Sequence, residues 1–526
     1  MRKEEKHAAI EGQTPRAREA NLGRTASRED NPMSMIIRSI VGADSISTLG
    51  VAYRIVWRWH FYAGLFCLPF IVMLSLSGSV YLFKPQIDAF LDRDYDDLRL
   101  VNAPKTLDEQ VAAAMAAVPN ARLKGAILRN DSADAARVHL MDATGRDIRV
   151  LVRPDTLEIM KVEAEKSRLT SIMHDLHGEL LIGEPGAIAV ELAGAWAIVM
   201  LITGLYLWWP RSNTGFGGVL YPRFGEGRRF YRDLHAVIGI WMSIFALFFL
   251  ISALPWTKVW GGAFQKIRGV PSWQALNQVR EVKQDWTTGP ASEQAKRLSE
   301  FRVAVPSNQE VSDEHAEHRG YARNAPASGH DLENVRIQGF DRVAAIVRPL
   351  GLADPILIAP PSPHKRNWVV RSETQNRPQQ VKLEFDPTTL ALVKREGFED
   401  KALIDRVVAI GVAAHEGQLF GWLNQALGLS VALGYLTVVT TALIMWLRRR
   451  PRGVLGAPPP PLQAPRLAPL IVVLVVALGV FLPTLGCSLL VVLATERVLC
   501  RFAPRAALWL GMRPYIRRSE FDKAAA

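Results

Sequence analysis

The stretch HFYAGLFCLPFIVMLSLSGSVYLF, residues 60–83, decides the fold. It begins with a histidine and continues apolar for more than the roughly 20 residues that a helix needs to cross a bilayer. Comparable apolar runs occupy 187–209, 236–256 and 422–447, and Glu191 is the only formal charge within all of these runs. The sequence therefore predicts an α-helical integral membrane bundle with four core spans.

The segments between the spans divide the rest of the chain. A fifth apolar region is interrupted by Pro483 and Gly486, and we expect either a hairpin of two helices or one kinked span there. The predicted order is a disordered basic arm (1–48), span 1 (49–84), a first external domain (85–176), span 2 (177–210), a basic loop (211–234), span 3 (235–257), a second external domain (258–414) with a flexible insertion at about 275–335, span 4 (415–448), a Pro-rich linker (449–466), the fifth apolar region (467–499) and a basic tail (500–526).

Loop charge predicts the orientation. The arm, the loop 211–234, the end of span 4 and the tail are rich in arginine, which places them in the cytoplasm by the positive-inside rule. We therefore expect a multi-pass protein of a bacterial inner membrane, surrounded by lipid, with a cytoplasmic N-terminus and periplasmic external domains. The net charge of +12 follows from this topology. The basic residues form no stripe interleaved with aromatics, so nucleic acid is not an expected partner.

Each external domain has the pattern of a small α+β unit. Residues 106–118 read as a helix with Thr106 as its N-cap and Glu109 three residues later. The alternating stretches ARVHLMD and RDIRVLVRP follow, joined by Ala-Thr-Gly, which indicates a hairpin. The strand exit at 154–157 is echoed at 387–390. The external domains contain no cysteine, and the chain has no C-x-x-C-H motif, which excludes haem attachment through that motif.

The chain repeats itself, and the repeat contains the histidines. An offset of 175 maps His60 to His235 and Ser77 to Ser252; an offset of 238 maps His177 to His415 and Thr203 to Thr441. Each half reads as span, external domain, span.

Four histidines placed alike in a repeat predict metal ligands. One histidine at a helix end is ordinarily a polar residue at the headgroup boundary, but four matched ones at membrane depth favour a functional role. Neutral imidazole is a common axial ligand of haem iron, and a four-helix bundle can hold the macrocycle between facing helices. Chain direction pairs His60 with His235 and His177 with His415. The sequence thus predicts two b-type haems, one near each membrane face.

Neighbouring residues fit this prediction. Gly64 and Gly239 lie four residues after His60 and His235, on the same helix face, and leave room for a flat ring. Arg58 and Arg232 are candidate partners for haem propionates. Three further predictions concern other residues. His174 is an alternative ligand, a residue supporting His177 or a group on the substrate side, and Glu191 faces either the bundle interior or the headgroups. His315, His318 and His330 read as part of a solvated loop.

Several motifs resemble the PepSY-associated transmembrane helix family. They are HFYAGL and LSGSVYLF in span 1, TGLYLWWPR ending span 2, RDLHAVIGIW opening span 3 and HEGQLFGW before span 4, and the external domains resemble PepSY domains. The resemblance covers roughly 50–450. It implies an iron-regulated membrane protein similar to ferrisiderophore reductases, with the haem ligands at His60, His177, His235 and His415.

The resemblance implies electron transfer from a cytoplasmic-side donor to a periplasmic Fe(III)–siderophore, whose reduction releases iron. No flavin or nicotinamide motif occurs, so we expect an external donor, either membrane quinol or a cytoplasmic reductase. The alternative is a non-enzymatic PepSY regulator or sensor of a periplasmic peptidase or ligand. A transporter ranks last, because the repeats run in the same orientation and the spans lack broken midplane segments.

Overall fold

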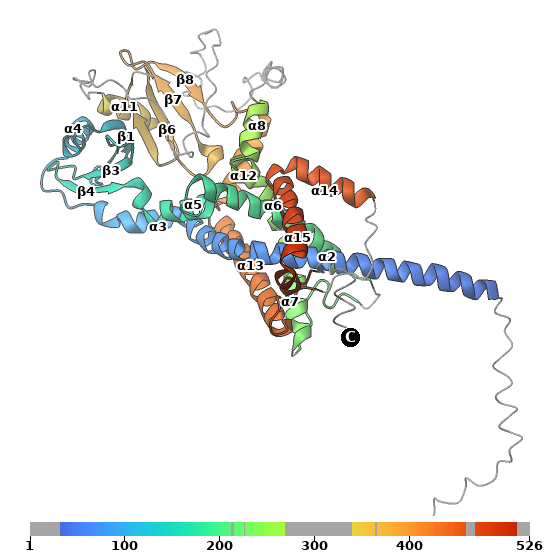
Figure 1. Cartoon of the computed structure of the whole chain (residues 1–526). Helices are drawn as coiled ribbons and strands as arrows, with labels where there is room; N and C mark the ends of the chain where they lie inside the picture. The colour runs from blue at the N-terminus through green and yellow to red at the C-terminus, as the bar shows by residue number, and fades with distance from the viewer. Residues whose placement is uncertain are drawn as a thin grey trace, which may run out of the picture.

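Four apolar helices form the membrane part of the protein. The computed structural model describes residues 32–211, 215–225, 227–268, 339–362, 365–458 and 469–512. Within these residues, the segments long and apolar enough to cross a membrane are Gly50–Tyr81, Glu184–Trp208, Arg228–Trp256 and Trp422–Arg449. The prediction of a helical membrane protein with four core spans is confirmed (Figure 1).

These segments belong to helices α2 (Pro32–Tyr81), α6 (Glu184–Trp208), α7 (Arg228–Ala253) and α13 (Trp422–Arg449). Helix α2 contacts α6 and α13, and α7 contacts the same two helices. The helices therefore form a four-membered bundle in which α2 lies diagonally opposite α7, and α6 lies diagonally opposite α13. A cofactor at the centre of such a bundle is reached from two diagonal helices.

One antiparallel sheet lies beyond one end of the bundle (Figure 1). Its strand order is β4-β3-β2-β1-β5-β6-β7-β8. The strands are β1 (Arg122–Leu128), β2 (Ala136–Met141), β3 (Asp147–Val152), β4 (Ile159–Ala164), β5 (Ile356–Ala359), β6 (Trp368–Ser372), β7 (Lys382–Phe385) and β8 (Leu392–Glu396). Helices α4 (Leu107–Ala117) and α11 (Phe340–Val347) share one apolar core with this sheet. The expected capping box of Thr106 and Glu109 begins α4, and the expected hairpin is β2–β3.

The two units that were predicted to be external join into one sheet, which the sequence pattern did not indicate. Strand β1 of the first unit pairs with β5 of the second, for example Ile127 with Leu357. The helix ends are also joined: Asp108 accepts the backbone N–H of Phe340, and Asp341 accepts the N–H of Leu107. Pairing β1 with β5 covers an edge that each four-stranded unit alone would expose. The two units therefore share a core instead of folding as separate domains.

Short helices connect the sheet to the bundle. They are α3 (Lys84–Asp92), η1 (Arg93–Tyr95), η2 (Glu165–Ser167), α5 (Leu169–Glu179), η3 (Leu254–Trp256), α8 (Trp260–Arg268) and α12 (Leu403–His415). Two more 3-10 turns lie within the sheet unit: η4 (Arg348–Leu350) precedes β5, and η5 (Arg377–Gln379) lies between β6 and β7. Because α5 and α12 are separate helices, spans 2 and 4 begin later than 177 and 415. Gly183 and Gly421, both with φ of +69°, turn the chain between the short helix and the span. Such a backbone conformation favours glycine.

The remaining boundaries differ in smaller ways. Helix α2 begins at Pro32, so the described part of the expected disordered arm is helical, and span 3 begins at Arg228, before 235. The fifth apolar region forms two helices, α14 (Pro469–Phe481) and α15 (Pro483–Phe502), which contact each other and are followed by α16 (Pro504–Trp509). Pro483 starts the second helix, where its missing N–H costs little. Residues 1–31, the insertion with His315, His318 and His330, and parts of the linker and tail lie outside the described residues.

Candidate functional site

The four histidines lie at two levels of the bundle. His60 is in α2 and His235 is in α7, well inside the helices. His177 is in α5 and His415 ends α12, so both precede their spans instead of opening them. We call His60 and His235 the arginine-side pair, and His177 and His415 the sheet-side pair.

The two members of each pair lie close together. The ring centroids of His60 and His235 are 6.4 Å apart with an interplanar angle of 83°, and those of His177 and His415 are 6.3 Å apart at 89°. The two pairs therefore have nearly the same geometry, although their residues come from different kinds of helix.

Hydrogen bonds from the neighbouring helix orient each arginine-side imidazole. His60 Nδ1 lies 3.1 Å from both Thr203 Oγ1 and the Met200 carbonyl. His235 Nδ1 lies 3.0 Å from the Val438 carbonyl and 3.4 Å from Thr441 Oγ1. A carbonyl can only accept, so Nδ1 carries the proton in both rings.

Serine hydroxyls orient the two imidazoles of the sheet-side pair. His177 Nδ1 is 3.0 Å from Ser77 Oγ on α2, and His415 Nδ1 is 3.0 Å from Ser252 Oγ on α7. Each hydroxyl donates its own proton to a helix carbonyl, that of Met73 or Phe249, and so accepts from the imidazole. This tautomer leaves Nε2 with a free lone pair in all four rings, which is the form that binds a metal.

The two levels are widely separated. Ser77 is 17 residues beyond His60 on α2, and Ser252 is 17 residues beyond His235 on α7. At 1.5 Å per residue, each interval spans about 26 Å. This separation is close to the thickness of the hydrocarbon core of a bilayer, about 30 Å.

Glycines allow two of the imidazoles to lie against a helix. A Cβ on Gly204 would stand 3.1 Å from His60 Cε1, and a Cβ on Gly78 would stand 3.1 Å from His177 Cε1. Both contacts are tighter than ordinary van der Waals distance. The corresponding positions of the second half hold Ala442 and Ala253.

A cavity of about 1240 Å³ runs through the bundle and is lined by all four histidines. This exceeds the 300–1,000 Å³ of ordinary small-molecule pockets. Gly64 and Gly239, singled out from the sequence, also line it; a Cβ on Gly239 would meet no atom within 4 Å. The space beside His235 is therefore open along this helix face.

The two ends of the cavity differ in charge. The arginine side is lined by five guanidinium groups, those of Arg228, Arg229, Arg232, Arg448 and Arg449. Arg232, expected to meet a propionate, lies there and also pairs with Asp233 at 2.8 Å. Arg58 does not line the cavity; it donates to the carbonyls of Pro458 and Gly511, so the structure gives it a role in holding the C-terminal segment.

The structure also places His174 and Glu191. His174 lines the sheet-side end of the cavity, with Nδ1 3.3 Å from Asp175 Oδ1 and its ring 5.5 Å from that of Tyr81. It therefore lies beside the sheet-side pair, and His177 is the residue that meets His415. Glu191 is buried and accepts the backbone N–H groups of Val259 and Trp260, at 2.7 and 3.1 Å, so it caps helix α8.

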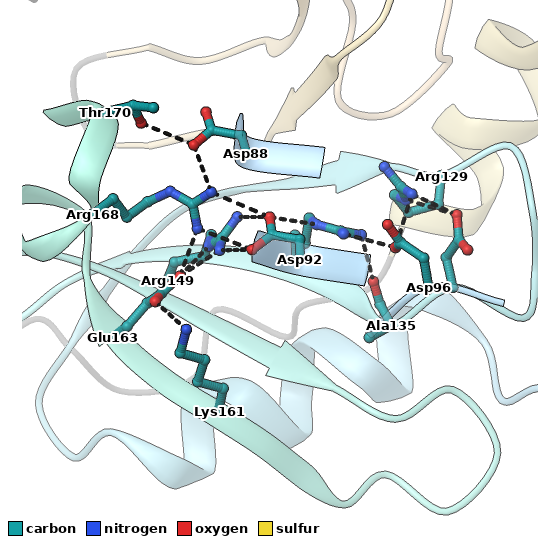
Figure 2. A network of polar contacts seen from close by, with 12 residues as sticks. Asp88, Asp92, Asp96, Arg129, Ala135, Arg149, Lys161, Glu163, Arg168 and Thr170 are labelled. Atoms are coloured by element: carbon teal, nitrogen blue, oxygen red, sulfur yellow. Dashed lines mark hydrogen bonds and ion pairs between the residues drawn. The ribbon is translucent and has the colours of Figure 1, made fainter. Parts of the chain in front are cut away.

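A buried ion-pair network fixes the helix that carries His177 (Figure 2). Asp92, at the end of α3, receives two hydrogen bonds of 2.8 Å from Arg149 of β3. Arg168, immediately before α5, reaches Asp92 at 3.1 Å and Glu163 of β4 at 2.8 Å. Thr170 and Arg168 also bind Asp88. The continuation of span 1, the sheet and the start of α5 are thereby tied together.

No group of three or more His, Cys, Asp or Glu side chains suited to a metal ion occurs among the described residues. Each pair offers two imidazoles, and so suits a metal whose other ligands come from elsewhere. A porphyrin supplies four nitrogens to its iron and leaves two axial positions.

The bundle, the paired imidazoles in its cavity and the sheet beyond one end define a polytopic helical membrane protein with an internal histidine site. The chain belongs to the PepSY-associated TM region family, whose sequence profile matches residues 57–449. This confirms the resemblance drawn from the motifs. No match to a curated protein was found.

Sequence reasoning did not assign a role to the residues that orient the imidazoles. Ser77, Ser252, Thr203 and Thr441 bind the four Nδ1 atoms. The repeat already aligned these hydroxyls in pairs, and that alignment was the available signal. The sequence does not indicate which imidazole on a neighbouring helix each hydroxyl contacts.

Proposed function

We propose that this protein carries electrons across a bacterial inner membrane through two b-type haems and reduces a periplasmic acceptor, a ferric siderophore. The observation that carries the proposal is the matched geometry of the two histidine pairs. Two imidazoles face each other across a cavity at each level, with the same tautomer and nearly the same separation.

The separation suits a metal between the rings. A metal–imidazole bond is about 2.0 Å, and a five-membered ring with bonds of about 1.33 Å places its nitrogen about 1.1 Å from the centroid. Two rings on opposite sides of one metal then have centroids about 6.2 Å apart. The measured values of 6.4 and 6.3 Å agree with this arrangement, and direct ring packing without a metal would ordinarily bring aromatic centroids anywhere from about 4.5 to 7 Å.

The residues around each histidine pair suit a bound haem. The hydroxyl and carbonyl acceptors hold each Nδ1–H, which fixes ring orientation and raises the basicity of Nε2. The five cavity-lining arginines suit carboxylates at the level of His60 and His235. Mostly apolar side chains of the spans line the space between the levels. When bound, haem would supply the one-electron chemistry.

The direction of transfer follows from the proposed topology. The arginine-rich end would face the cytoplasm by the positive-inside rule and receive electrons from quinol or a cytoplasmic reductase. The sheet would lie in the periplasm, next to the second histidine pair, and a ferric chelate would be reduced there. Fe(II) is bound more weakly than Fe(III) by hard oxygen ligands, so reduction would release the iron.

Absorbance of the purified protein tests the proposal. Protein from haem-supplied cells should show b-type spectra in both oxidation states, and His235→Ala should lose about half of the haem while the other site remains. His139→Ala is the matched control, because His139 lies in β2, away from the cavity. Protein that contains no b-type haem under these conditions would refute the assignment.

A second test separates this proposal from a regulatory role. The sheet and its two helices have a core of their own, which a peptide-binding regulator would also require. Replacing all four histidines should abolish ferric siderophore reduction in membrane vesicles if the pairs conduct electrons. Full retention of function in the iron-limited cell would favour the regulator.

A further inference from the structure

The sheet-side end of the cavity holds far fewer cations than the other end. Among its lining residues are Arg377, Lys258, Glu416 and Glu191. Glu191 is occupied by backbone N–H groups, and Lys258 lies 3.4 Å from Glu184 at the surface. Arg377 is therefore the cation best placed to receive a buried anion beside the sheet-side pair.

Arg377 is held next to His415 by its local structure. It begins the 3-10 turn η5, which contacts α12, the helix that ends with His415. Its guanidinium stacks on Trp256 at 4.9 Å from the ring centroid, and one terminal nitrogen is 3.8 Å from Glu416 Oε1. Glu416 directly follows His415, so the guanidinium lies close to the sheet-side pair.

The guanidinium retains hydrogen-bonding capacity. In the part of the chain that the structure describes, the buried Nε of Arg377 has no hydrogen-bond partner. A buried donor without a partner is costly. The contact with Glu416 is too long for a hydrogen bond, and a planar guanidinium binds a carboxylate through two parallel N–H groups.

We propose that Arg377 binds a propionate carboxylate of the macrocycle held by His177 and His415. The inference rests on the proposed function and adds an anchor that is specific to one of its two sites. A cation beside the macrocycle stabilises the reduced, less positive iron. Arg377 is thus also a positioning residue that raises the reduction potential of the sheet-side group.

The test measures each group separately in full-length protein. His60→Ala leaves the sheet-side group alone, and in this background Arg377→Gln should lower its midpoint potential. The expected change is on the order of tenfold in the reduction equilibrium, which is about 59 mV for one electron. The same substitution in the His415→Ala background should leave the arginine-side group unchanged. Arg395→Gln, on β8 away from the cavity, is the matched control.

Replacing the carboxylates decides whether Arg377 acts through a propionate. Protein loaded with haem dimethyl ester has no free carboxylates, so Arg377→Gln should then cause no further shift, as a double-mutant cycle requires. A shift that persists with the ester, or an unchanged potential and haem content with ordinary haem, would overturn the inference. If the Arg377→Gln protein binds haem at neither site, the Arg377→Lys protein decides whether Arg377 anchors the macrocycle through its charge. Retained sheet-side haem in this variant supports such an anchor, and loss of that haem contradicts it. Wild-type protein without haem would instead refute the proposed function.

Discussion

The arginine-side and sheet-side pairs have nearly the same geometry but different structural support. His60 and His235 lie inside long apolar helices, and a backbone carbonyl accepts from each Nδ1. His177 and His415 lie on short helices of 11 and 13 residues, and serine hydroxyls orient them. The placement of the sheet-side pair therefore depends on the short helices and the sheet beyond the bundle. The comparison shows that one site geometry can be built either by the bundle itself or by the domain beyond it.

The largest effect should follow from opening the ion-pair network. Asp92→Asn leaves Arg149 and Arg168 buried without their shared carboxylate, a loss worth about 3–5 kcal/mol. Hydrogen exchange should show lost protection in α5 and the adjacent strands, with little change around His60. Asp94→Asn, an exposed neighbour, is the control. Equal loss of protection at both levels would show that the sheet does not support one pair selectively.

The orienting hydroxyls should matter more on the sheet side. Ser252→Ala removes the acceptor of His415 Nδ1, and loss of such a partner typically weakens metal binding 10–100-fold. Thr441→Val should cost less, because the Val438 carbonyl still holds His235. Haem titration of each variant measures both effects. The controls are Ser430→Ala and Thr437→Val, two exposed hydroxyls on α13. Equal losses would mean that the carbonyl contributes nothing.

Acid should weaken the sheet before the bundle. Burial, together with nearby Arg149 and Lys124, lowers the pKa of His139 to about 3, from about 6.5 in the unfolded chain. The unfolded state therefore binds more protons between these values, so stability falls as the pH drops from 6.5, by at most about 1.4 kcal/mol per pH unit. His139→Gln should remove this part of the pH dependence of thermal unfolding. If the pH dependence of thermal unfolding were unchanged in His139→Gln, the buried neutral His139 would not be its cause.

The smallest effects should come from the glycines beside the rings. Gly204→Ala and Gly78→Ala each place a Cβ 3.1 Å from an imidazole carbon, so the ring must move by a few tenths of an ångström. The second half already carries alanine at these positions, and alanine adds up to about 1 kcal/mol of helix propensity. We expect near-native stability and a small spectral shift of the affected site alone. Gly239→Ala, which meets no atom within 4 Å, should shift neither site.

The bundle could be predicted from the sequence because apolar length is a local signal and the histidine positions recur in the internal repeat. Apolar length predicted the spans, and the offset of 175 related His60 to His235 and Ser77 to Ser252. The helix break before span 2 was missed because Leu180 and Leu181 continue the apolar pattern while adopting positive φ. The break before span 4 lies at Gly417 and Gly421, which also have positive φ. The contact of Arg58 with Gly511 was missed because nothing in the surroundings of Arg58 along the chain indicates it.

Long-range pairing explains the other differences. Nothing in the local pattern of β1 or β5 indicates that they pair, since alternation specifies a strand but not its neighbour. The caps formed by Asp108 and Asp341 were also missed because they are long-range contacts. Each carboxylate accepts a backbone N–H at the start of a helix that is far away in the chain. A helix cap is ordinarily sought within a few residues, so Asp108 reads as a first-turn acid of its own helix.

The β1–β5 junction constrains how the protein is made. Asn130 and Asp354, which bind each other beside this junction, are 224 residues apart. During synthesis, β1 is complete long before β5 exists, and two further spans must be inserted in between. An unpaired strand edge is a template for wrong association. The nascent chain therefore carries an open edge while the second and third spans are made, and the edge closes only when β5 has been translated.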